Sequence, residues 1–254
     1  MNYDELINTA TDVGYMLLAN GAEIYRVEES MQRIFRAYGV EASEIFAIPT
    51  CIYVTISTEE GRPVTKIKRV YTRGTNLDKV ERVNDLCRRV CREIPDFKII
   101  RNELKKIDLR PNYSFFQQML AFSLVAFSFT LFYGGNLEDA ICAIFCGAAV
   151  KGTLSQMERF HGNSFFTNII ASGAAAAIAL IAVHFNIHLN PDKIIIGALM
   201  NLVPGIAITS FMRDLIAGDL IAGLIRFTES LLVATAIAIG AGVALTVTRT
   251  IWGV

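Results

Sequence analysis

The sequence predicts a membrane protein in which a small N-terminal cytoplasmic α+β domain precedes an α-helical bundle of about five transmembrane helices. Charge gives the first indication, because residues 1–110 hold 18 Lys and Arg and 17 Asp and Glu, whereas residues 111–254 hold 6 and 7. Periodicity gives the second, since helical and strand patterns occur before residue 95 and long uncharged runs follow residue 110. A soluble segment is therefore expected to precede a membrane segment.

The overall charge excludes one class of partner, and the start of the chain indicates a compartment. The formal net charge is zero and no Lys/Arg cluster is interleaved with aromatic residues, so no nucleic-acid partner is expected. The opening stretch MNYDELINTATD lacks the basic start and apolar run of a secretory signal. The first segment is therefore expected to stay in the cytoplasm.

Two helices open the predicted soluble domain. Over residues 3–20, apolar side chains recur at the spacing of one helix face, namely Leu6, Ala10, Val13 and Leu17. Gly21 follows, and glycine accepts the left-handed conformation found at helix ends. A second amphipathic helix is expected over residues 23–38, and Gly39 ends it.

Strands and a third helix complete this domain. Over residues 41–73 the apolar period changes to two, and the EEGRP turn divides runs rich in β-branched and aromatic residues. Two or three antiparallel strands are expected, with Pro49 at a strand break or an edge. Asn76 or Asp78 can cap the third helix, which Pro95 stops.

Residues 96–111 are expected to form a basic linker helix between a domain of residues 1–95 and a transmembrane region of residues 112–254. Its cations are Lys98, Arg101, Lys105, Lys106 and Arg110. Basic residues beside a span are retained on the cytoplasmic side. An ordinary charged linker helix without lipid contact would show the same pattern.

Uncharged runs predict the membrane spans. Four of them are long enough for about 20 helical residues, and they cover residues 111–137, 160–191, 194–212 and 230–248. A fifth segment, residues 138–156, is uncharged only from Ala140 to Val150, so a span, a re-entrant segment and a short core helix all fit. Counting it as a span places the basic loops mainly inside.

The expected spans are approximately residues 114–133, 137–156, 164–186, 193–212 and 220–248. The protein is then a multi-pass protein of a bacterial inner membrane, with the N-terminus inside. Small residues would allow close helix packing, and they are Gly147, Gly173, Ala177, Gly197, Gly218, Gly223, Gly240 and Gly242. Transporters are often built from two related halves, and this sequence predicts one set of five helices. Another chain or a second copy of this chain is therefore expected to complete the bundle.

The segment from Asn201 to Glu229 is the strongest candidate for a functional site. Ionisable residues interrupt it although the surrounding sequence is membrane-like, and such residues are costly there unless they have a partner or a water path. Pro204 and Gly205 predict an interrupted helix, which membranes tolerate where it lines a cavity. The combination is typical of a transport site.

Two motifs occur together in this sequence: GAE-x-YRVE at residues 21–28 and PG…RDL…GD…G-x-x-R-x-x-E at residues 204–229. With IPTCIYVTIS and RVYTRGTNLDKVERVN between them, they make nearly the whole chain similar to the threonine/serine exporter family. In length, the chain resembles the larger, five-helix subunit of the family's split form, which is a two-component succinate exporter. The resemblance implies a secondary exporter of small carboxylates or hydroxy amino acids, completed by a smaller five-helix chain.

The resemblance also assigns motif positions. In this sequence they are Gly21, Ala22, Glu23, Tyr25, Arg26, Val27 and Glu28 in the soluble domain, and Pro204, Gly205, Asp214, Asp219, Gly223, Arg226 and Glu229 in the membrane region. One position departs from the family pattern. Ile24 stands where the family commonly has threonine, which leaves no hydroxyl there for a catalytic or ligand role.

Charged residues of the second motif suggest a mechanism. Arg226 would clamp a substrate carboxylate, because its planar guanidinium matches two oxygens. Asp214, Asp219 or Glu229 would carry the coupling proton, since burial raises a carboxyl pKa toward the working range. In the alternative interpretation, both aspartates and Arg213 form a solvated turn, and Arg226 extends to the membrane interface.

Four further residues are candidates for substrate binding. Lys151 offers a second positive charge, or it marks the cytoplasmic end of the second helix. Asn201 would line a path, or it forms an interhelical hydrogen bond. Pro204 and Gly205 would contribute the backbone of the interrupted helix.

The soluble domain carries its own cluster of polar residues at Glu23, Tyr25, Arg26 and Glu28. A carboxylate pair beside a guanidinium fits an enzyme, and acidic residues in a helix's first turns equally favour the helix dipole. The rival to an exporter is therefore a membrane-anchored enzyme or ligand sensor that acts through this domain.

No metal or cofactor is expected. The five cysteines lack C-x-x-C spacing; Cys87 with Cys91 and Cys142 with Cys146 are four residues apart, which could suit a metal, but no histidine is close in sequence. Buried free thiols are the preferred interpretation. No G-x-x-x-x-G-K-[ST] loop occurs, so a proton or other ion gradient is expected to drive export.

Overall fold

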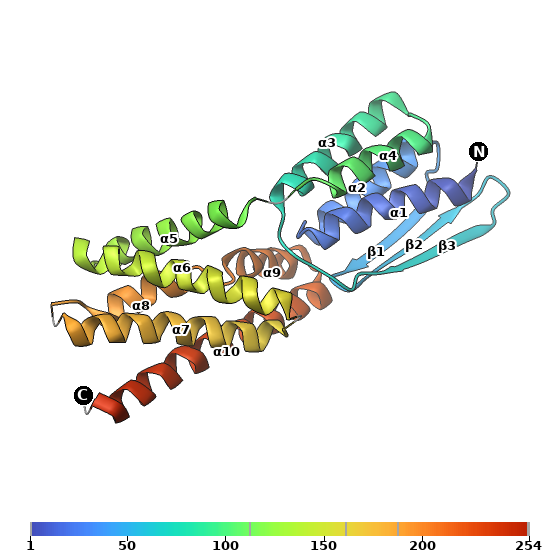
Figure 1. The fold of residues 1–254 in the computed structure, drawn as a ribbon. Coiled ribbons are helices and arrows are strands. Elements are labelled where there is room, and N and C mark those ends of the chain that lie inside the picture. The colour runs from blue at the N-terminus through green and yellow to red at the C-terminus, as the bar shows by residue number, and fades with distance from the viewer. Residues whose placement is uncertain (1, 112, 161, 187, 253–254) are drawn as a thin grey trace. The chain divides into compact units, whose positions relative to one another are not determined.

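The computed structural model describes residues 2–111, 113–160, 162–186 and 188–252, and Figure 1 shows its ribbon. The chain divides into two compact units. The first comprises residues 1–111 and 208–227, and the second comprises residues 112–207 and 228–254. A short segment far along the sequence therefore belongs to the same unit as the N-terminal domain.

The first unit combines helices with a three-stranded antiparallel sheet of order β1-β2-β3. In chain order its complete elements are α1 (Tyr3–Ala19), α2 (Ile24–Ala37), β1 (Ser43–Ile48), β2 (Cys51–Ser57), β3 (Pro63–Arg69), α3 (Leu77–Glu93) and α4 (Phe97–Asp108). Helices α1 and α2 contact the sheet, and α3 and α4 pack in turn on α1 (Figure 1). The predicted strands and three helices are confirmed.

The core of the first unit lies between the helices and one face of the sheet. The predicted stripe of α1 is fully buried there, together with Ile52, Val54 and Ile56 of β2. On the opposite face, Phe46 pairs with Tyr53 across β1 and β2, and both remain exposed. The alternation of the strands therefore places one apolar set inside, as period two requires.

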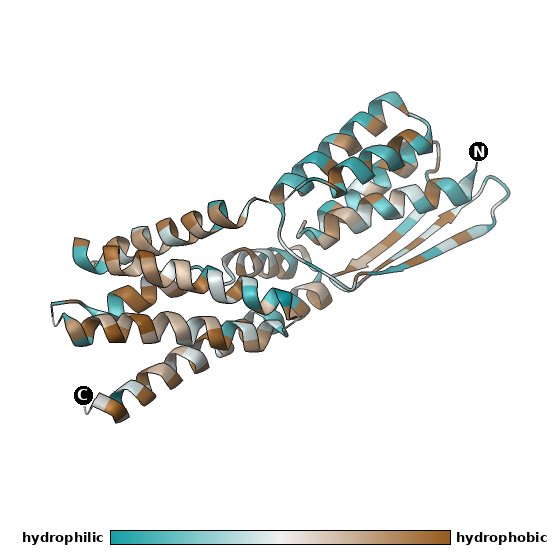
Figure 2. Cartoon of the chain, in the orientation of Figure 1, coloured by the Kyte–Doolittle hydropathy of each residue, from teal (hydrophilic) through white to brown (hydrophobic). Residues whose placement is uncertain are grey.

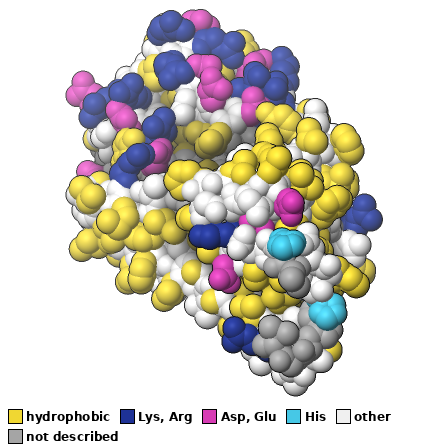
Figure 3. All heavy atoms as spheres, turned by 90° about the vertical axis from the view of Figure 1, so that its left-hand side faces the viewer, with side chains coloured by type: hydrophobic (Ala, Val, Ile, Leu, Met, Phe, Trp, Pro, Cys, Tyr) yellow, Lys and Arg dark blue, Asp and Glu magenta, His cyan; other side chains and the backbone are white. Residues whose placement is uncertain are grey.

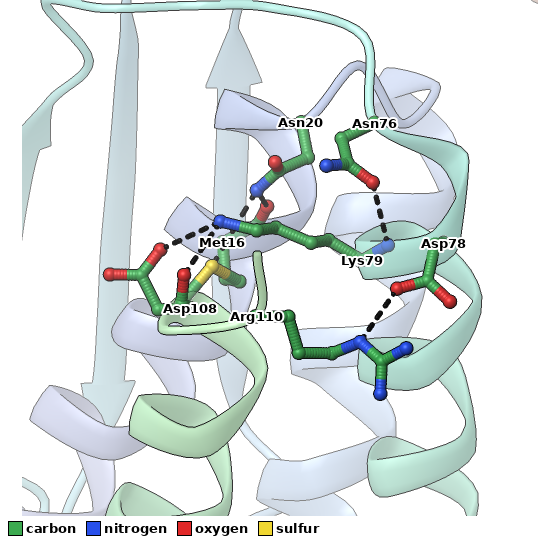
Figure 4. A network of polar contacts seen from close by, with 7 residues as sticks. All are labelled: Met16, Asn20, Asn76, Asp78, Lys79, Asp108 and Arg110. Carbon is green, nitrogen blue, oxygen red and sulfur yellow. Dashed lines mark hydrogen bonds and ion pairs between the residues drawn. The ribbon is translucent and has the colours of Figure 1, made fainter. Parts of the chain in front are cut away.

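Local capping fixes the helix ends. Gly21 and Gly39 have φ values of 92° and 84°, in the left-handed region that favours glycine. The Asn76 side chain accepts a hydrogen bond from the Lys79 N–H at 3.1 Å, so Asn76 is the cap of α3. Figure 4 shows this contact. The predicted ends and one of the two predicted caps are confirmed.

Polar contacts tie the end of α4 to the start of α3 (Figure 4). Lys79 Nζ donates to the Asp108 carbonyl at 2.8 Å, and Arg110 Nε donates to an Asp78 carboxylate oxygen at 2.9 Å. Three apolar residues of α4 are also buried in the first core, namely Ile100, Leu104 and Ile107. The basic segment is therefore a packed, ion-paired helix, while its predicted limits at residues 96 and 111 stay predictions.

The second unit is a helical bundle. Its elements are α5 (Phe115–Phe132), α6 (Leu137–Arg159), α7 (Ser164–Phe185) and α8 (Pro191–Leu199), with parts of α9 (Gly205–Ala217) and α10 (Leu220–Trp252). Hydrophobic residues predominate along α5, α7 and α10, whereas α3 and α4 are largely hydrophilic (Figure 2). Many large apolar side chains of the bundle are exposed, and Figure 3 shows broad areas of hydrophobic side chains on the surface it draws. Such a surface suits lipid.

Within the described residues, four helices are long and apolar enough to cross a membrane: α5, α6, α7 and α10. They support a membrane protein, but the predicted count of five spans is not confirmed. The predicted span at residues 193–212 is two short helices, because α8 ends at Leu199 and α9 begins at Gly205. The segment of residues 138–156, whose role the sequence left open, lies within the long helix α6.

The interruption predicted at Pro204 is present. Asn201 Nδ2 donates to the Ala198 carbonyl at 3.2 Å and to the Phe122 carbonyl of α5 at 3.1 Å. Its amide thus bonds a carbonyl at the end of α8, and Pro204 offers no N–H to continue the helical ladder. The break therefore starts before the proline itself.

Glycines set the spacing of the bundle helices at several contacts. A Cβ built at Gly147 of α6 would lie 2.5 Å from the Phe122 carbonyl oxygen of α5, and one at Gly240 of α10 would lie 2.1 Å from the Ile169 carbonyl oxygen of α7. Gly218 and Gly242 have no neighbour within 4 Å of such an atom. Close packing at Gly147 and Gly240 is confirmed, while the prediction of close packing is wrong for Gly218 and Gly242.

We expect Gly147→Ala to destabilise the bundle by about 1–3 kcal/mol, because the new methyl group forces α5 and α6 apart. Gly152→Ala in the same helix is the matched control, since nothing lies within 4 Å of its Cβ position. That control should stabilise α6 by about 0.5–1 kcal/mol, the ordinary helical preference for alanine over glycine. Thermal unfolding of both variants in detergent measures the difference. Equal melting temperatures would contradict the close contact.

Candidate functional site

The turn between α9 and α10 packs into the first unit. Gly218 has a φ of 94°, which permits the reversal, and the Asp219 N–H donates to the Asp214 carbonyl at 2.9 Å. Ala222, early in α10, is 2% exposed and belongs to the hydrophobic core of the N-terminal domain. Residues 208–227 thereby bring their charges to that domain.

Asp214 is buried in this segment, with 1% of its surface exposed. Its Oδ2 lies 3.4 Å from Arg226 Nη1, yet within the described residues neither carboxylate oxygen accepts a hydrogen bond. Burial raises the pKa of Asp214 above its ordinary value, although the positive charge of Arg226 opposes this rise. The interpretation of a solvated turn is therefore wrong for Asp214, whereas Arg213 beside it is 55% exposed.

Arg226 is held by the first motif. Its Nη2 donates to the Ala22 carbonyl at 2.9 Å, and its side chain is only 11% exposed. Ala22 follows Gly21, where a Cβ would lie 3.1 Å from the Gly74 carbonyl oxygen. The glycine thus permits the backbone course that presents the Ala22 carbonyl to Arg226. The guanidinium is thus packed against the first motif, and extension of Arg226 to the membrane interface stays a prediction.

Glu23 lies between two arginines. Its Oε2 is 2.9 Å from Arg26 Nε, and its Oε1 pairs with Arg213 Nη1 of α9. Glu23 occupies the N-cap position of α2 without a capping hydrogen bond from its side chain. The side chain therefore connects the first motif to the second instead of closing its own helix.

Glu28 joins α2 to the sheet. Its Oε1 accepts a hydrogen bond from the Ala47 N–H at 2.7 Å. Burial raises the pKa of Glu28, the Ala47 bond opposes the rise, and the negative charge of Asp219 adds to it. The negative charge of Asp219 in the second motif thus acts on a carboxylate of the first motif.

The predicted site residues divide between the two units. The first unit contains Glu23, Tyr25, Arg26, Glu28, Asp214, Asp219 and Arg226. The second unit contains Lys151, Asn201, Pro204, Gly205 and Glu229. Contacts bring together most of the first group, whereas Tyr25 is 38% exposed and its hydroxyl accepts a hydrogen bond from Arg26 Nη2 at 3.4 Å. The functional roles of both groups stay predictions.

Two candidates of the second unit meet at Phe122. Lys151 is 6% exposed, and its Nζ lies 5.7 Å from the centre of the Phe122 ring. Asn201 Nδ2 donates to the carbonyl of the same residue. Lys151 lies about two turns before the end of α6 at Arg159, so it does not mark the end of that helix.

Sequence reasoning missed several partners in these contacts. Arg213 belonged to the recognised run of charges, but its pairing with Glu23 joins residues 190 positions apart. Ala22 contributes only its backbone carbonyl, and every residue type has such a carbonyl, so the sequence did not indicate this contact. Phe122 is one of many aromatic residues of an apolar helix and gave no signal in the sequence.

Metal-binding chemistry has no support in the part of the chain that the structure describes. No group of three or more His, Cys, Asp or Glu side chains there could hold an ion. The five cysteines are free thiols, of which Cys51, Cys87 and Cys146 are buried as predicted and Cys91 and Cys142 are half-buried. Burial raises the pKa of Cys87 to about 12. That thiol therefore stays neutral at physiological pH.

The arrangement of Arg226 and Asp214 permits two kinds of chemistry. A buried guanidinium next to a buried carboxylate complements a zwitterion. The negative group of the ligand can pair with Arg226, and its positive group can pair with Asp214. Alternatively, protonation of Asp214 leaves Arg226 as a net positive site for an anion. Both uses couple the charge state of Asp214 to ligand binding.

Curated relatives are similar along nearly the whole chain. The "Threonine/serine exporter" of Corynebacterium glutamicum is 23% identical over 244 residues, covering 93% of this chain and 50% of that protein. The "Probable succinate transporter subunit YjjP" of Escherichia coli K12 is 24% identical over 242 residues, covering 94% of this chain and 92% of that protein. The chain thus spans half the length of the first and nearly all of the second.

No solved structure matches the chain. The sequence pattern of the family described as "Putative threonine/serine exporter" matches residues 8–248, a range that includes both motifs and most of both units. The chain belongs to the threonine/serine exporter family.

Proposed function

We propose that this chain is a proton-coupled exporter subunit that binds a hydroxy amino acid between Arg226 and Asp214. The observation that carries the proposal is the Asp214 carboxylate, which is buried beside Arg226 with no hydrogen bond to either oxygen among the described residues. Buried polar groups normally have partners, so a carboxylate without one is a candidate ligand site. Membership of an exporter family supports transport as the activity.

A zwitterion fits the two charges. The α-carboxylate of the substrate binds the Arg226 guanidinium, and the α-ammonium binds the Asp214 carboxylate, which then gains the hydrogen bonds it lacks. The 3.4 Å contact between the two side chains is long for a charged hydrogen bond, so a ligand gives up little by replacing it.

Coupling to protons follows from Asp214. Burial raises its pKa, so protonation occurs closer to physiological pH than for an exposed aspartate. A protonated Asp214 no longer attracts an ammonium group, and substrate and proton therefore compete for it. Competition of this kind gives antiport, in which entering protons drive the amino acid outward.

A dicarboxylate is the second candidate substrate, because the relative that this chain covers to 92% is named a succinate transporter subunit. Its second carboxylate would bind Arg213, and Asp214 would have to be protonated to remove repulsion. Proton and substrate then bind together, so the sign of the pH effect distinguishes the two substrates.

The proposal also covers the location of the two units, the partner chain and the route through the membrane. The first unit lies in the cytoplasm and the bundle spans the inner membrane, with a small five-helix chain or a second copy completing the transporter. The second-unit candidates line the route through the bilayer, and they are Lys151, Asn201, Pro204, Gly205 and Glu229. The buried Lys151 and the interrupted backbone at Pro204 support this route.

Everted membrane vesicles from the native host test the proposal. Export then appears as uptake, and the membrane potential is held at zero with potassium and valinomycin. We expect an acidic lumen to drive accumulation of labelled threonine, and an alkaline lumen to prevent it. Succinate uptake favoured by an acidic medium would support the dicarboxylate instead. If the uptake of both threonine and succinate is independent of the imposed pH gradient, proton coupling is contradicted.

A further inference from the structure

An open groove lies between α2 and α3 in the first unit, and its lining includes neither Arg226 nor Asp214. Its volume is about 930 Å³. Its charged lining consists of Arg26, Arg33, Arg36, Arg88, Arg92 and Glu29. Five arginines against one glutamate give a formal surplus of four positive charges, in a chain whose net charge is zero.

Three of these five arginines form ion pairs, and two do not. Arg33 pairs with Glu29 at 2.6 Å, Arg88 pairs with Asp85, and Arg26 pairs with Glu23. Within the residues that the structure describes, the guanidinium groups of Arg36 and Arg92 have neither an ion pair nor a hydrogen bond to another side chain. These two unpaired cations come from different helices and line the same groove.

Helix dipoles account for only part of this charge. Both α2 and α3 end here, since the Tyr38 hydroxyl after α2 donates to the Pro95 carbonyl after α3. Each helix C-terminus carries about half a negative charge, so two of them offset about one unit. The two unpaired arginines, Arg36 and Arg92, still exceed that offset, and a concave surface concentrates the remaining field.

We infer that this groove binds a small anion with at least two negative groups, either a polycarboxylate or a phosphate ester. The guanidinium fork matches carboxylate and phosphate oxygens alike. Arg26 and Arg36 are ten residues apart, or about 15 Å along α2, so a single charge engages one end only. A polyvalent anion bridges Arg36 and Arg92 and thereby joins the two helices.

The floor of the groove is compatible with such a ligand. Cys87 lines it as a neutral thiol, because burial raises its pKa to about 12. Ser30 and Asn84 contribute uncharged hydrogen-bonding groups beside it. Among the residues that line the groove, Glu29 is the one acid, and it is already paired with Arg33.

The groove also has a direct connection to the candidate transport site. Arg26 lines the groove and shares Glu23 with Arg213 of α9. A polyvalent anion long enough to reach Arg26 as well would compete with Glu23 for Arg26, and so would change the contacts of the segment that holds Asp214. This regulatory consequence rests on the proposed function, whereas binding in the groove does not.

Isothermal titration of the purified full chain in detergent tests the binding, with citrate and pyrophosphate as probes and acetate as the monovalent reference. Ionic strength is kept constant, because salt screens such contacts. We expect saturable binding of citrate or pyrophosphate and none of acetate, and the probe that binds more tightly identifies the anionic group. The variant Arg36→Gln/Arg92→Gln should weaken this binding at least about tenfold.

The matched control is Arg62→Gln/Lys105→Gln, which removes the same charge from exposed positions outside the groove. It should bind the probes as the wild type does. Absence of saturable binding, or an equal loss in both double variants, would overturn the groove as a site. Because heat of binding is measured without transport, failure here leaves the exporter proposal intact, and failure of threonine uptake leaves the groove intact.

Discussion

Replacing Arg226 with methionine is expected to abolish most threonine uptake by everted vesicles. Arg226 is 11% exposed, and it is the cation that the proposal assigns to the substrate carboxylate. Removing one partner of a desolvated charge pair costs about 2 kcal/mol or more, which corresponds to about a 30-fold loss. Methionine keeps much of the side-chain volume, so the loss reports charge and hydrogen bonding instead of a cavity.

Stability has to be separated from transport in this variant. Arg226→Met leaves Asp214 buried without its counter-charge and removes the bond to the Ala22 carbonyl, so a lower melting temperature is expected. The double variant Arg226→Met/Asp214→Asn removes the uncompensated charge. It should recover part of the melting temperature while uptake stays lost.

Arg249→Met provides the matched control for Arg226→Met. Arg249 is an exposed arginine of the same helix, and it belongs to the other unit. Its replacement should leave threonine uptake unchanged. Wild-type uptake by a folded Arg226→Met protein would show that the substrate carboxylate binds elsewhere.

Short-range signals explain why the first unit was predictable. Asn76 caps α3 through a bond to a residue three positions away, and Gly21 ends a helix by its own conformation. The alternation of β2 follows from one buried and one exposed sheet face. Each of these features depends on residues that are close in the sequence, so it could be predicted from the sequence.

Hydropathy was a poorer guide to the bundle. It predicted a single span at residues 193–212, because composition records whether residues suit lipid and not where a helix ends. At the break, the Asn201 side chain donates to the Phe122 carbonyl 79 residues earlier, a contact that hydropathy does not record. Conversely, α6 is long despite Glu138 and Asp139 near its start, because Asp139 is satisfied by Asn136 and Asn190.

The candidate site was only half predictable for the same reason. Charges in a membrane-like sequence identified Asp214 and Arg226, since they stand out against their surroundings. Their partners come from the other end of the chain: Arg226 bonds Ala22 across 204 positions, and Arg213 pairs with Glu23 across 190. Tertiary packing alone creates these contacts, so the sequence predicted the residues and not the pairs.

Wild-type threonine uptake should rise as the pH of the external medium rises through the pKa of Asp214. In the proposed function, ionised Asp214 binds the substrate ammonium, and burial places the pKa of Asp214 above the ordinary aspartate value. Uptake is therefore expected to be lost at a less acidic pH than an exposed aspartate would require. Initial rates at fixed lumenal pH and zero membrane potential give this profile.

Asp214→Asn should then remove threonine uptake at every pH. Asparagine resembles the protonated aspartate in shape and charge, so it fixes the protein in the form that competes with the substrate ammonium. A dicarboxylate exporter predicts the opposite, because the same variant would be fixed in its binding-competent form and would transport succinate without pH dependence. Asp192→Asn, an exposed acid at the start of α8, controls for the loss of one negative charge. Threonine uptake by Asp214→Asn with an unchanged pH profile would assign proton coupling to another acid and remove Asp214 from the mechanism.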